Sequence, residues 1–227
     1  MSTKNSKNYS NESVKEYYHS TGLYDSIIYK KNKTNQNLPK EEIIENLLLK
    51  NKKLSNKVTG TNKKIILSNK NYKSKIMVLG DMPSQKDIDN NELFSDDSGE
   101  LLTKMLGAIS IDSSQVYLAN IIPFYLTKEE GKNIKKYNSL LRKIVHEHIS
   151  AINPETILLL GSFALQTLFG EEYSIAKNRG QWLSYSAANN SINIIPSFHP
   201  TFLLKQPSQK KKSWEDLQEL QKKLNNA

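Results

Sequence analysis

Residues 76–83 read Ile76-Met77-Val78-Leu79-Gly80-Asp81-Met82-Pro83, and the fold class follows from this segment. A short continuous apolar run that ends at a glycine is typical of a strand buried on both faces. The Gly-Asp-Met-Pro sequence then predicts a turn that places an acidic side chain at the carboxyl end of the strand. Because a strand apolar on both faces needs helices on both sides, the segment indicates an α/β fold.

Three further apolar runs repeat this pattern. They span residues 116–122, 157–160 and 192–196, and helical spacing of apolar residues is found at 101–109, 138–149, 163–169 and 214–224. Strands that alternate with helices predict a parallel sheet with right-handed crossovers. We therefore expect an α/β three-layer sandwich with a central four-stranded parallel sheet.

Residues 1–40 differ in composition from the rest of the chain. They are rich in Lys, Asn, Ser and Tyr and show little hydrophobic periodicity, which predicts a disordered or loosely attached polar tail. Residues 41–227 are then expected to form a single domain. No apolar run approaches the roughly 20 residues of a membrane span, and residues 1–20 lack the apolar core of a signal peptide. We expect a cytoplasmic protein without membrane contact.

Composition excludes several kinds of chemistry. The 227 residues include no cysteine, which excludes disulfides, thiolate metal sites, iron–sulfur clusters and cysteine nucleophiles. No Walker loop, Gly-x-Gly-x-x-Gly sequence or serine nucleophile elbow is present. The formal net charge of +9 favours a polyanionic partner such as nucleic acid, although only two of the 32 basic residues are arginine.

Polar residues follow each of the four expected strands. They are Asp81, Asn120, the pair Gly161-Ser162, and His199. Three of them have an ordinary explanation when taken alone, since Asp and Ser cap helices and a His-Pro sequence forms turns, although a Gly-Ser helix start can also bind phosphate. Asn120 differs, because a buried amide must find partners for its donors and its acceptor. The carboxyl ends of parallel strands, however, open at one edge of the sheet. Their common placement predicts one cleft that holds a carboxylate, an amide, a glycine turn and an imidazole.

Roughly residues 75–227 resemble the uracil-DNA glycosylase superfamily. Gly80-Asp81-Met82-Pro83-Ser84 looks like the first motif of this superfamily. Phe94 lies fourteen residues after Gly80 and is followed by Gly99-Glu100-Leu101-Leu102. This spacing is similar to the family 4 pattern of a ring-stacking phenylalanine and a Gly-x-Leu-Leu helix start.

The resemblance continues in the second half of the chain. Val116 to Asn120 is similar to the strand that carries the uracil-reading asparagine, and His199 to Lys205 resembles the motif His-Pro-x-x-Leu-Leu-Arg. The resemblance implies a monofunctional DNA repair glycosylase of the base excision pathway. Such an enzyme flips uracil out of DNA, hydrolyses its N-glycosidic bond and leaves an abasic site.

The resemblance also implies a role for each motif residue. The catalytic residues would be Asp81 and His199; the substrate-binding residues Gly80, Met82, Phe94 and Asn120; and the DNA-binding residues Gly161, Ser162, Leu203, Leu204 and Lys205. Asp81, ionised at pH 7 if it keeps its ordinary pKa of about 3.9, would stabilise the sugar cation and orient a water molecule. Either Leu203 or Leu204 would fill the space that the flipped base leaves.

This chain departs from the family 4 pattern in its lack of cysteine. Family 4 enzymes hold an iron–sulfur cluster on four cysteines, and the position that matches one ligand is Phe124. We therefore expect no metal or organic cofactor. Ser84 replaces a glycine and Lys205 an arginine, which keeps the charge but loses bidentate phosphate contact.

The expected partner is uracil-containing DNA. We expect a monomer without an obligatory protein partner, associated with the nucleoid. Two alternatives stay open at the level of sequence. One is a non-catalytic protein of the same fold that binds DNA or uracil. The other is a glycosylase for another deaminated base, such as hypoxanthine or xanthine.

Overall fold

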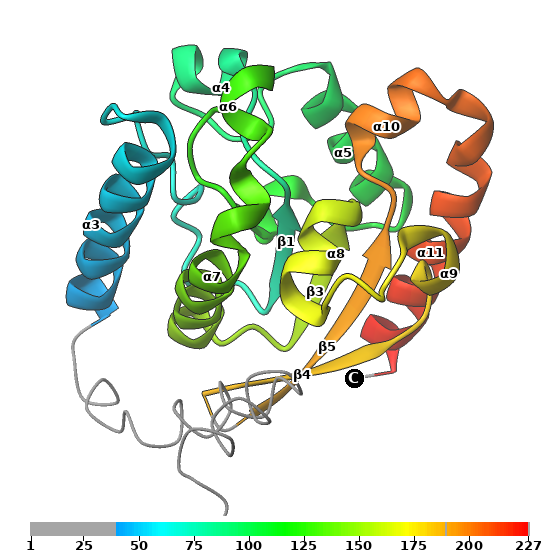
Figure 1. Cartoon of the computed structure of the whole chain (residues 1–227). Coiled ribbons are helices and arrows are strands. Elements are labelled where there is room, and N and C mark those ends of the chain that lie inside the picture. Colours follow the sequence, from blue (N-terminus) through cyan, green and yellow to red (C-terminus); the bar gives the residue numbers. More distant parts are fainter. Residues whose placement is uncertain (1–39, 189, 227) are drawn as a thin grey trace, which may run out of the picture. The chain divides into compact units, whose positions relative to one another are not determined.

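In a computed structural model of the chain, residues 40–188 and 190–226 are described (Figure 1). The tail expected at residues 1–40 lies outside this part of the chain, apart from Lys40. The chain divides into two compact units, Met1–Ile43 and Ile44–Ala227. The second unit contains the sheet described below.

The sheet has five strands in the order β2-β1-β3-β5-β4. They are β1 (Ile76–Gly80), β2 (Tyr117–Asn120), β3 (Thr156–Leu160), β4 (Leu183–Ala187) and β5 (Asn190–Ser197). The four strands expected from the sequence are all present and pair in parallel. The additional strand, β4, pairs with β5 in antiparallel orientation. Its Leu-Ser-Tyr-Ser-Ala sequence alternates apolar and polar residues, so it lacks the continuous apolar run by which the other four were identified.

Helices cover both faces of the sheet, which confirms the three-layer α/β sandwich. They are α3 (Lys40–Thr59), α4 (Gln85–Asn90), α5 (Asp97–Ala108), α6 (Lys128–Gly131), α7 (Asn138–Ile152), α8 (Ser162–Phe169), α9 (Ile175–Asn178), α10 (Pro200–Lys205) and α11 (Lys210–Asn225). Short 3₁₀ turns add η2 (Ser113–Gln115), η3 (Ile134–Tyr137) and η4 (Pro207–Gln209). Helices α5 and α11 lie on one face, and α7 and α8 lie on the other (Figure 1). None of the described helices is long and apolar enough to cross a membrane.

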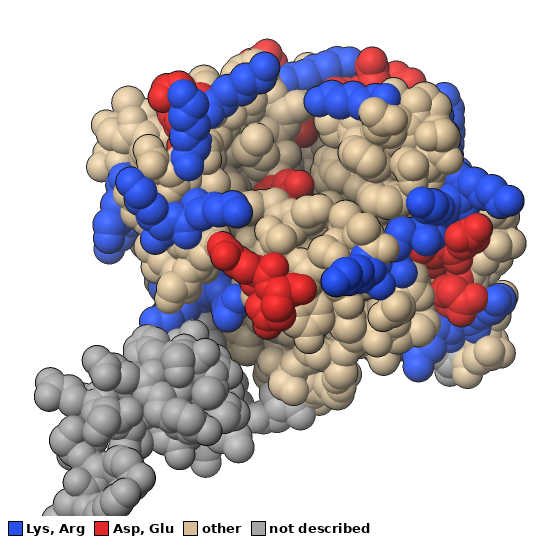
Figure 2. Space-filling model, turned by 45° about the vertical axis from the view of Figure 1, so that its right-hand side comes forward, with Lys and Arg blue, Asp and Glu red and all other residues tan. Residues whose placement is uncertain are grey.

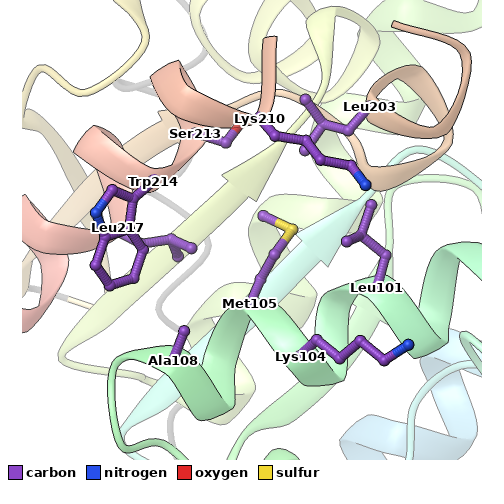
Figure 3. A pocket seen from close by; sticks show the side chains of 9 residues that line it. All are labelled: Leu101, Lys104, Met105, Ala108, Leu203, Lys210, Ser213, Trp214 and Leu217. Atoms are coloured by element: carbon purple, nitrogen blue, oxygen red, sulfur yellow. The ribbon is translucent and has the colours of Figure 1, made fainter. Parts of the chain in front are cut away.

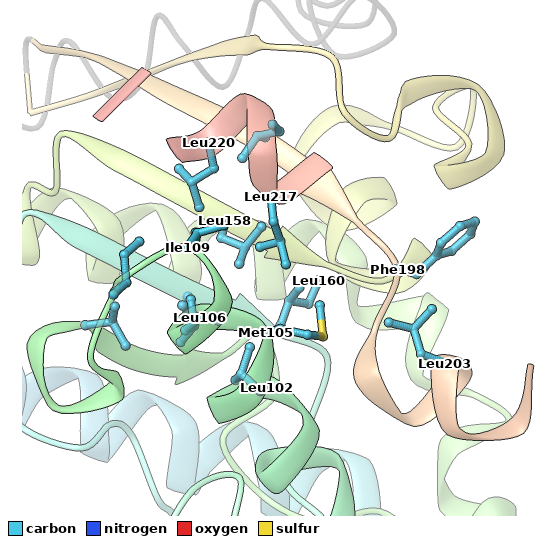
Figure 4. Close-up of a cluster of buried hydrophobic side chains, with 14 residues drawn as sticks. Leu102, Met105, Leu106, Ile109, Leu158, Leu160, Phe198, Leu203, Leu217 and Leu220 are labelled. Carbon is cyan, nitrogen blue, oxygen red and sulfur yellow. The ribbon is translucent and has the colours of Figure 1, made fainter. Parts of the chain in front are cut away.

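The core between the sheet, α5 and α11 also anchors the short helix α10. Leu106 of α5, Leu158 of β3 and Leu217 of α11 are buried together in this core. Leu203 of α10 joins the same cluster and is 1% exposed (Figure 4). Burial of one leucine side chain contributes about 1.5–3 kcal/mol. Leu203 therefore holds α10 against the sheet, and with it His199, the residue that caps the start of this helix.

Candidate active site

Three residues from distant parts of the chain converge at Gly80, the last residue of β1. A Cβ atom at Gly80 would lie 2.5 Å from Oδ1 of Asn120, 3.0 Å from Cζ of Phe94 and 3.4 Å from Nε2 of His199. Asn120 is brought there by β2, because Gly80 and Asn120 are paired across the two parallel strands. Glycine at position 80 thus leaves free the space toward which the three other side chains point.

Two of the polar atoms that face this space have no hydrogen-bond partner within the described residues. They are Oδ1 of Asn120 and Nε2 of His199, and both atoms are buried. Buried polar atoms are normally paired, since an unpaired one costs about 1–3 kcal/mol. Their presence side by side indicates that a ligand supplies the missing partners.

His199 presents a hydrogen-bond donor to this space. The backbone N–H of Thr201 donates to Nδ1 of His199 over 3.2 Å, so Nδ1 is the unprotonated nitrogen. Burial lowers the pKa of His199 to about 4, against the opposing charges of Asp96 and Asp87. At pH 7 the ring is therefore neutral, and its one proton is on Nε2.

The Phe94 ring is held over the site by an unusual backbone conformation. Phe94 has a φ of 57°, and its ring stacks against that of His199 with centroids 6.2 Å apart. Gly99 is required below it, because a Cβ atom there would lie 1.6 Å from the Phe94 carbonyl oxygen.

Asp87, which sequence reasoning missed, ties the Phe94 loop to the loop after β1. Its Oδ1 accepts the backbone N–H of Ser95 over 2.7 Å, and its Oδ2 accepts that of Ser84 over 2.9 Å. The side chain is 4% exposed. The available signal was the Ser84-x-x-Asp87 spacing of a capping box, which the structure contains at the start of α4.

Asp81 lies against the start of α8. The backbone N–H of Ala164 donates to Oδ1 of Asp81 over 2.9 Å. Gly161 has a φ of 99°, and a Cβ atom there would lie 2.8 Å from Oδ2 of Asp81. The burial of the carboxyl group raises the pKa of Asp81 to about 7, although the Ala164 N–H opposes this rise. The expectation that Asp81 keeps an ordinary pKa is therefore wrong.

The residues expected to contact DNA divide into exposed and buried ones. Leu204 is 42% exposed, and Ser162 and Lys205 are also exposed. Met82, which was expected to bind the substrate, is 41% exposed. Leu203 lies in the core, so it would have to leave the core to enter a base stack. We therefore no longer assign it a DNA contact.

Gly161 was expected to contact DNA, but its backbone serves the fold. Its N–H donates to the carbonyl of Ser197 over 3.0 Å and is not available to a phosphate. Its structural task is instead to make room for the carboxylate of Asp81. In the view of Figure 2, lysine and arginine side chains lie around a hollow, and an acidic side chain is visible inside it.

A separate cavity of about 210 Å³ lies between α5, α10 and α11 (Figure 3). Its lining consists of Leu101, Lys104, Met105, Ala108, Leu203, Lys210, Ser213, Trp214 and Leu217. This lining is mostly apolar and includes neither of the unpartnered atoms of Asn120 and His199. The cavity is thus distinct from the candidate active site.

The residues of this chain do not fit an iron–sulfur cluster. The full sequence contains no cysteine, and the described residues contain no group of three or more His, Asp or Glu that could hold a metal ion. Phe124, the position that the resemblance matches with one cluster ligand, is an apolar side chain that is completely buried. No chemical step is therefore assigned to such a cluster.

We expect Phe124→Ala to lower the free energy of unfolding by about 3–5 kcal/mol, as is usual when a buried phenylalanine is truncated. Urea denaturation of both proteins measures the loss. Phe202→Ala is the control, because Phe202 is 40% exposed. A loss of stability in Phe124→Ala that is equal to or smaller than the loss in Phe202→Ala would contradict a packing role for Phe124. An iron chelator should leave the Tm of the wild type unchanged.

Comparison with known proteins places the chain beside DNA repair enzymes. A sequence profile of the Uracil DNA glycosylase superfamily matches residues 68–218. The type-4 uracil-DNA glycosylase of Archaeoglobus fulgidus is 26% identical over 141 residues, which cover 60% of this chain and 70% of that protein. The Thermotoga maritima enzyme of the same name is 28% identical over 149 residues, covering 63% and 73%. That of Saccharolobus solfataricus is 26% identical over 163 residues, covering 68% and 73%.

Proposed function

The chain belongs to the uracil DNA glycosylase superfamily, and on that premise we propose that it hydrolyses the N-glycosidic bond of uracil in DNA and leaves an abasic site. The observation that carries the proposal is the pair of unpartnered atoms at Gly80. Oδ1 of Asn120 accepts a hydrogen bond, and Nε2–H of His199 donates one. We further propose that the protein acts as a monomer on nucleoid DNA in the cytoplasm.

This pair of atoms is complementary to one edge of uracil. The ring N3–H of uracil donates to Oδ1 of Asn120, and the adjacent O2 accepts from Nε2–H of His199. Cytosine carries a lone pair instead of a proton at N3, so it would leave the buried Oδ1 facing another acceptor. The site would therefore discriminate strongly against cytosine, because Oδ1 of Asn120 would be buried without a hydrogen-bond donor. The Phe94 ring stacks on the base, which contributes roughly 1–3 kcal/mol.

The chemistry follows from charge development at the glycosidic bond. When the bond between C1′ and N1 breaks, its electron pair leaves with uracil and collects at O2, where the Nε2–H of His199 stabilises it. The sugar becomes cationic, and the carboxylate of Asp81 stabilises that charge. Water then adds to C1′ and gives its proton to Asp81, which yields the abasic sugar. The uracil anion takes up a proton from solvent on release, and Asp81 returns its proton to solvent, so that one water is consumed in each turnover. Only the ionised form of Asp81 performs these two tasks.

Access to the base requires that it be flipped out of the helix. Leu204, exposed on α10, is placed to fill the vacated position in the stack. Lys205 and the exposed Lys210, Lys211 and Lys212 at the start of α11 supply positive charge for the neighbouring phosphates.

Base release from oligonucleotides tests the proposed function. The purified protein is incubated with single- and double-stranded DNA that contains uracil, hypoxanthine, xanthine or thymine, and abasic product is scored by alkaline cleavage. We expect uracil release that is lost in Asp81→Ala and in His199→Ala. Release of another base alone would support the second deaminated-base alternative. Binding of uracil-containing DNA without release would support the non-catalytic one.

We expect Leu204→Ala to lower the excision rate on double-stranded DNA by about tenfold, because a wedge offsets part of the unstacking free energy. The loss should be smaller on single-stranded DNA, where no stack needs to be filled. Rates on the two substrates measure the difference. Leu49→Ala on α3 serves as control, since Leu49 is 50% exposed and lies on a different helix. Equal losses on both substrates would speak against a wedge.

A further inference from the structure

Arginine is rare in this chain, and one of its two arginines makes contacts that lysine cannot make. Only Arg142 and Arg179 are arginine among 32 basic residues. Nη2 of Arg179 lies 2.7 Å from Oδ1 of Asp216, and its Nε donates to Oδ2 over 3.2 Å. Oδ1 of Asp216 has no hydrogen-bond partner within the described residues, so its contact with Nη2 is an ion pair, and the hydrogen bond is the one from Nε. A lysine ammonium is a single point of charge and cannot make both contacts at once. The contacts at position 179 therefore require an arginine.

Asp216 is a buried carboxylate that links Arg179 to the end of β5. The residue is 1% exposed on α11, and its Oδ2 also accepts the hydroxyl of Ser197 over 2.6 Å. Gly180 allows the approach, because a Cβ atom there would lie 2.5 Å from Oδ1 of Asp216. A carboxylate in such a place is held by its partners, and removal of one partner is strongly destabilising.

Ser197 connects this pair to both candidate catalytic residues. Its carbonyl accepts the N–H of Gly161 over 3.0 Å, and Gly161 in turn lies against the carboxylate of Asp81. Two residues further along the chain, His199 begins α10. Between them, the Phe198 ring lies under the Arg179 guanidinium at 5.9 Å. Ser197, the last residue of β5, thus holds Gly161 beside Asp81 and is followed by Phe198, which precedes His199.

We propose that Arg179 and Asp216 form a positioning pair that acts through Ser197 on Asp81 and His199, which sets the rate of the chemical step rather than the affinity for DNA. The inference rests on the proposed function and adds positioning residues to it. Nη2 of Arg179 also lies 3.2 Å from Oε2 of Glu215 and donates to the carbonyl of Lys212. Its side chain is 16% exposed. A phosphate contact would therefore require Arg179 to leave these partners.

Single-turnover kinetics at saturating DNA separate positioning from binding. We expect Arg179→Lys and Ser197→Ala each to lower the rate of base release by about tenfold or more, with the Kd for uracil-containing DNA changed less than about twofold. Ser197→Thr keeps the hydroxyl and should restore most of the rate. The double variant should be no slower than the worse single one, because both changes break the same connection.

Arg142→Lys is the matched control. Nε of Arg142 donates to the carbonyl of Thr167 over 2.7 Å, near the far end of α8, so the same substitution removes a partly buried arginine contact elsewhere. All variants are compared at a temperature where circular dichroism shows them folded. Arg142→Lys should keep the wild-type rate. Equal loss in Arg142→Lys and Arg179→Lys, or no loss in either, overturns the proposal.

A measurement without DNA keeps this inference separate from the proposed function. In ¹⁵N-histidine NMR spectra, the His199 ring signals, assigned by their absence in His199→Asn, should shift in Arg179→Lys and Ser197→Ala but not in Arg142→Lys. If the wild type releases no base, the proposed function fails, and the NMR result alone decides the positioning inference. Unchanged His199 signals in both variants overturn it whatever the kinetics show.

Discussion

We expect Asp81→Asn to lower the rate of the proposed uracil release by roughly 10³-fold, because an amide neither accepts the proton of the attacking water nor balances the charge of the sugar. The side chain keeps its shape, and its oxygen still accepts the N–H of Ala164. Single-turnover assays with uracil-containing DNA measure the loss. Asp97→Asn, which changes an exposed carboxylate on α5, should keep the wild-type rate.

The wild-type protein should show the ionisation of Asp81 in the pH profile of the proposed activity. Burial raises the pKa of Asp81 to about 7, and only the ionised form is active, so kcat/KM should rise with pH through about 7. His199, with a pKa of about 4, stays neutral near pH 7, so its ionisation does not cause a second change in kcat/KM there. A flat kcat/KM between pH 5 and 8 would contradict the raised pKa of Asp81.

Stability should respond in the opposite sense from activity. A raised pKa means that the folded state favours the protonated acid, so this contribution to stability is present below pH 3.8 and is lost as pH rises through about 7. The amide of Asp81→Asn does not ionise, so the variant does not lose stability in this way as pH rises. Asp81→Asn should therefore have a higher Tm than the wild type at pH 8 and a nearly equal Tm at pH 4. A lower Tm at pH 8 would show that the charged carboxylate stabilises the fold.

Asn120→Ala should lower uracil excision by about 10²- to 10³-fold, because it removes the acceptor that faces N3–H of the base. The Kd for DNA should change little, since the phosphate contacts that we propose come from exposed lysines on α10 and α11. Single-turnover rates and a fluorescence binding assay measure the two quantities.

A control of the same residue type is available on α3. Asn51 is 1% exposed, against 3% for Asn120, and its Oδ1 is likewise buried without a partner in the described structure. Asn51→Ala should leave the excision rate unchanged where both variants are folded. A similar loss in both variants would show that the effect of Asn120→Ala comes from packing.

Much of the candidate site could be predicted because its residues stand directly after apolar strands. Asp81 and His199 follow such strands and Asn120 is the last residue of one, and parallel pairing brings those ends to one edge of the sheet. Strand β4 was missed because alternation of apolar and polar residues over only five positions also occurs in loops. Asp87 was missed because its hydrogen bonds to Ser84 and Ser95 depend on how two loops pack.

The sequence by itself determined the parallel sheet and the identity of the polar residues at its edge. The sheet and its edge residues depend on apolar runs of neighbouring residues and on the direction of each strand. Both features are evident in short segments of the sequence. Tertiary structure alone decided that Leu203 lies in the core while Leu204 is exposed, and that Asp81 has a pKa of about 7. Burial and hydrogen bonding come from segments far apart in the chain. No local pattern specifies which of two adjacent leucines faces the sheet, or how much water reaches a carboxylate.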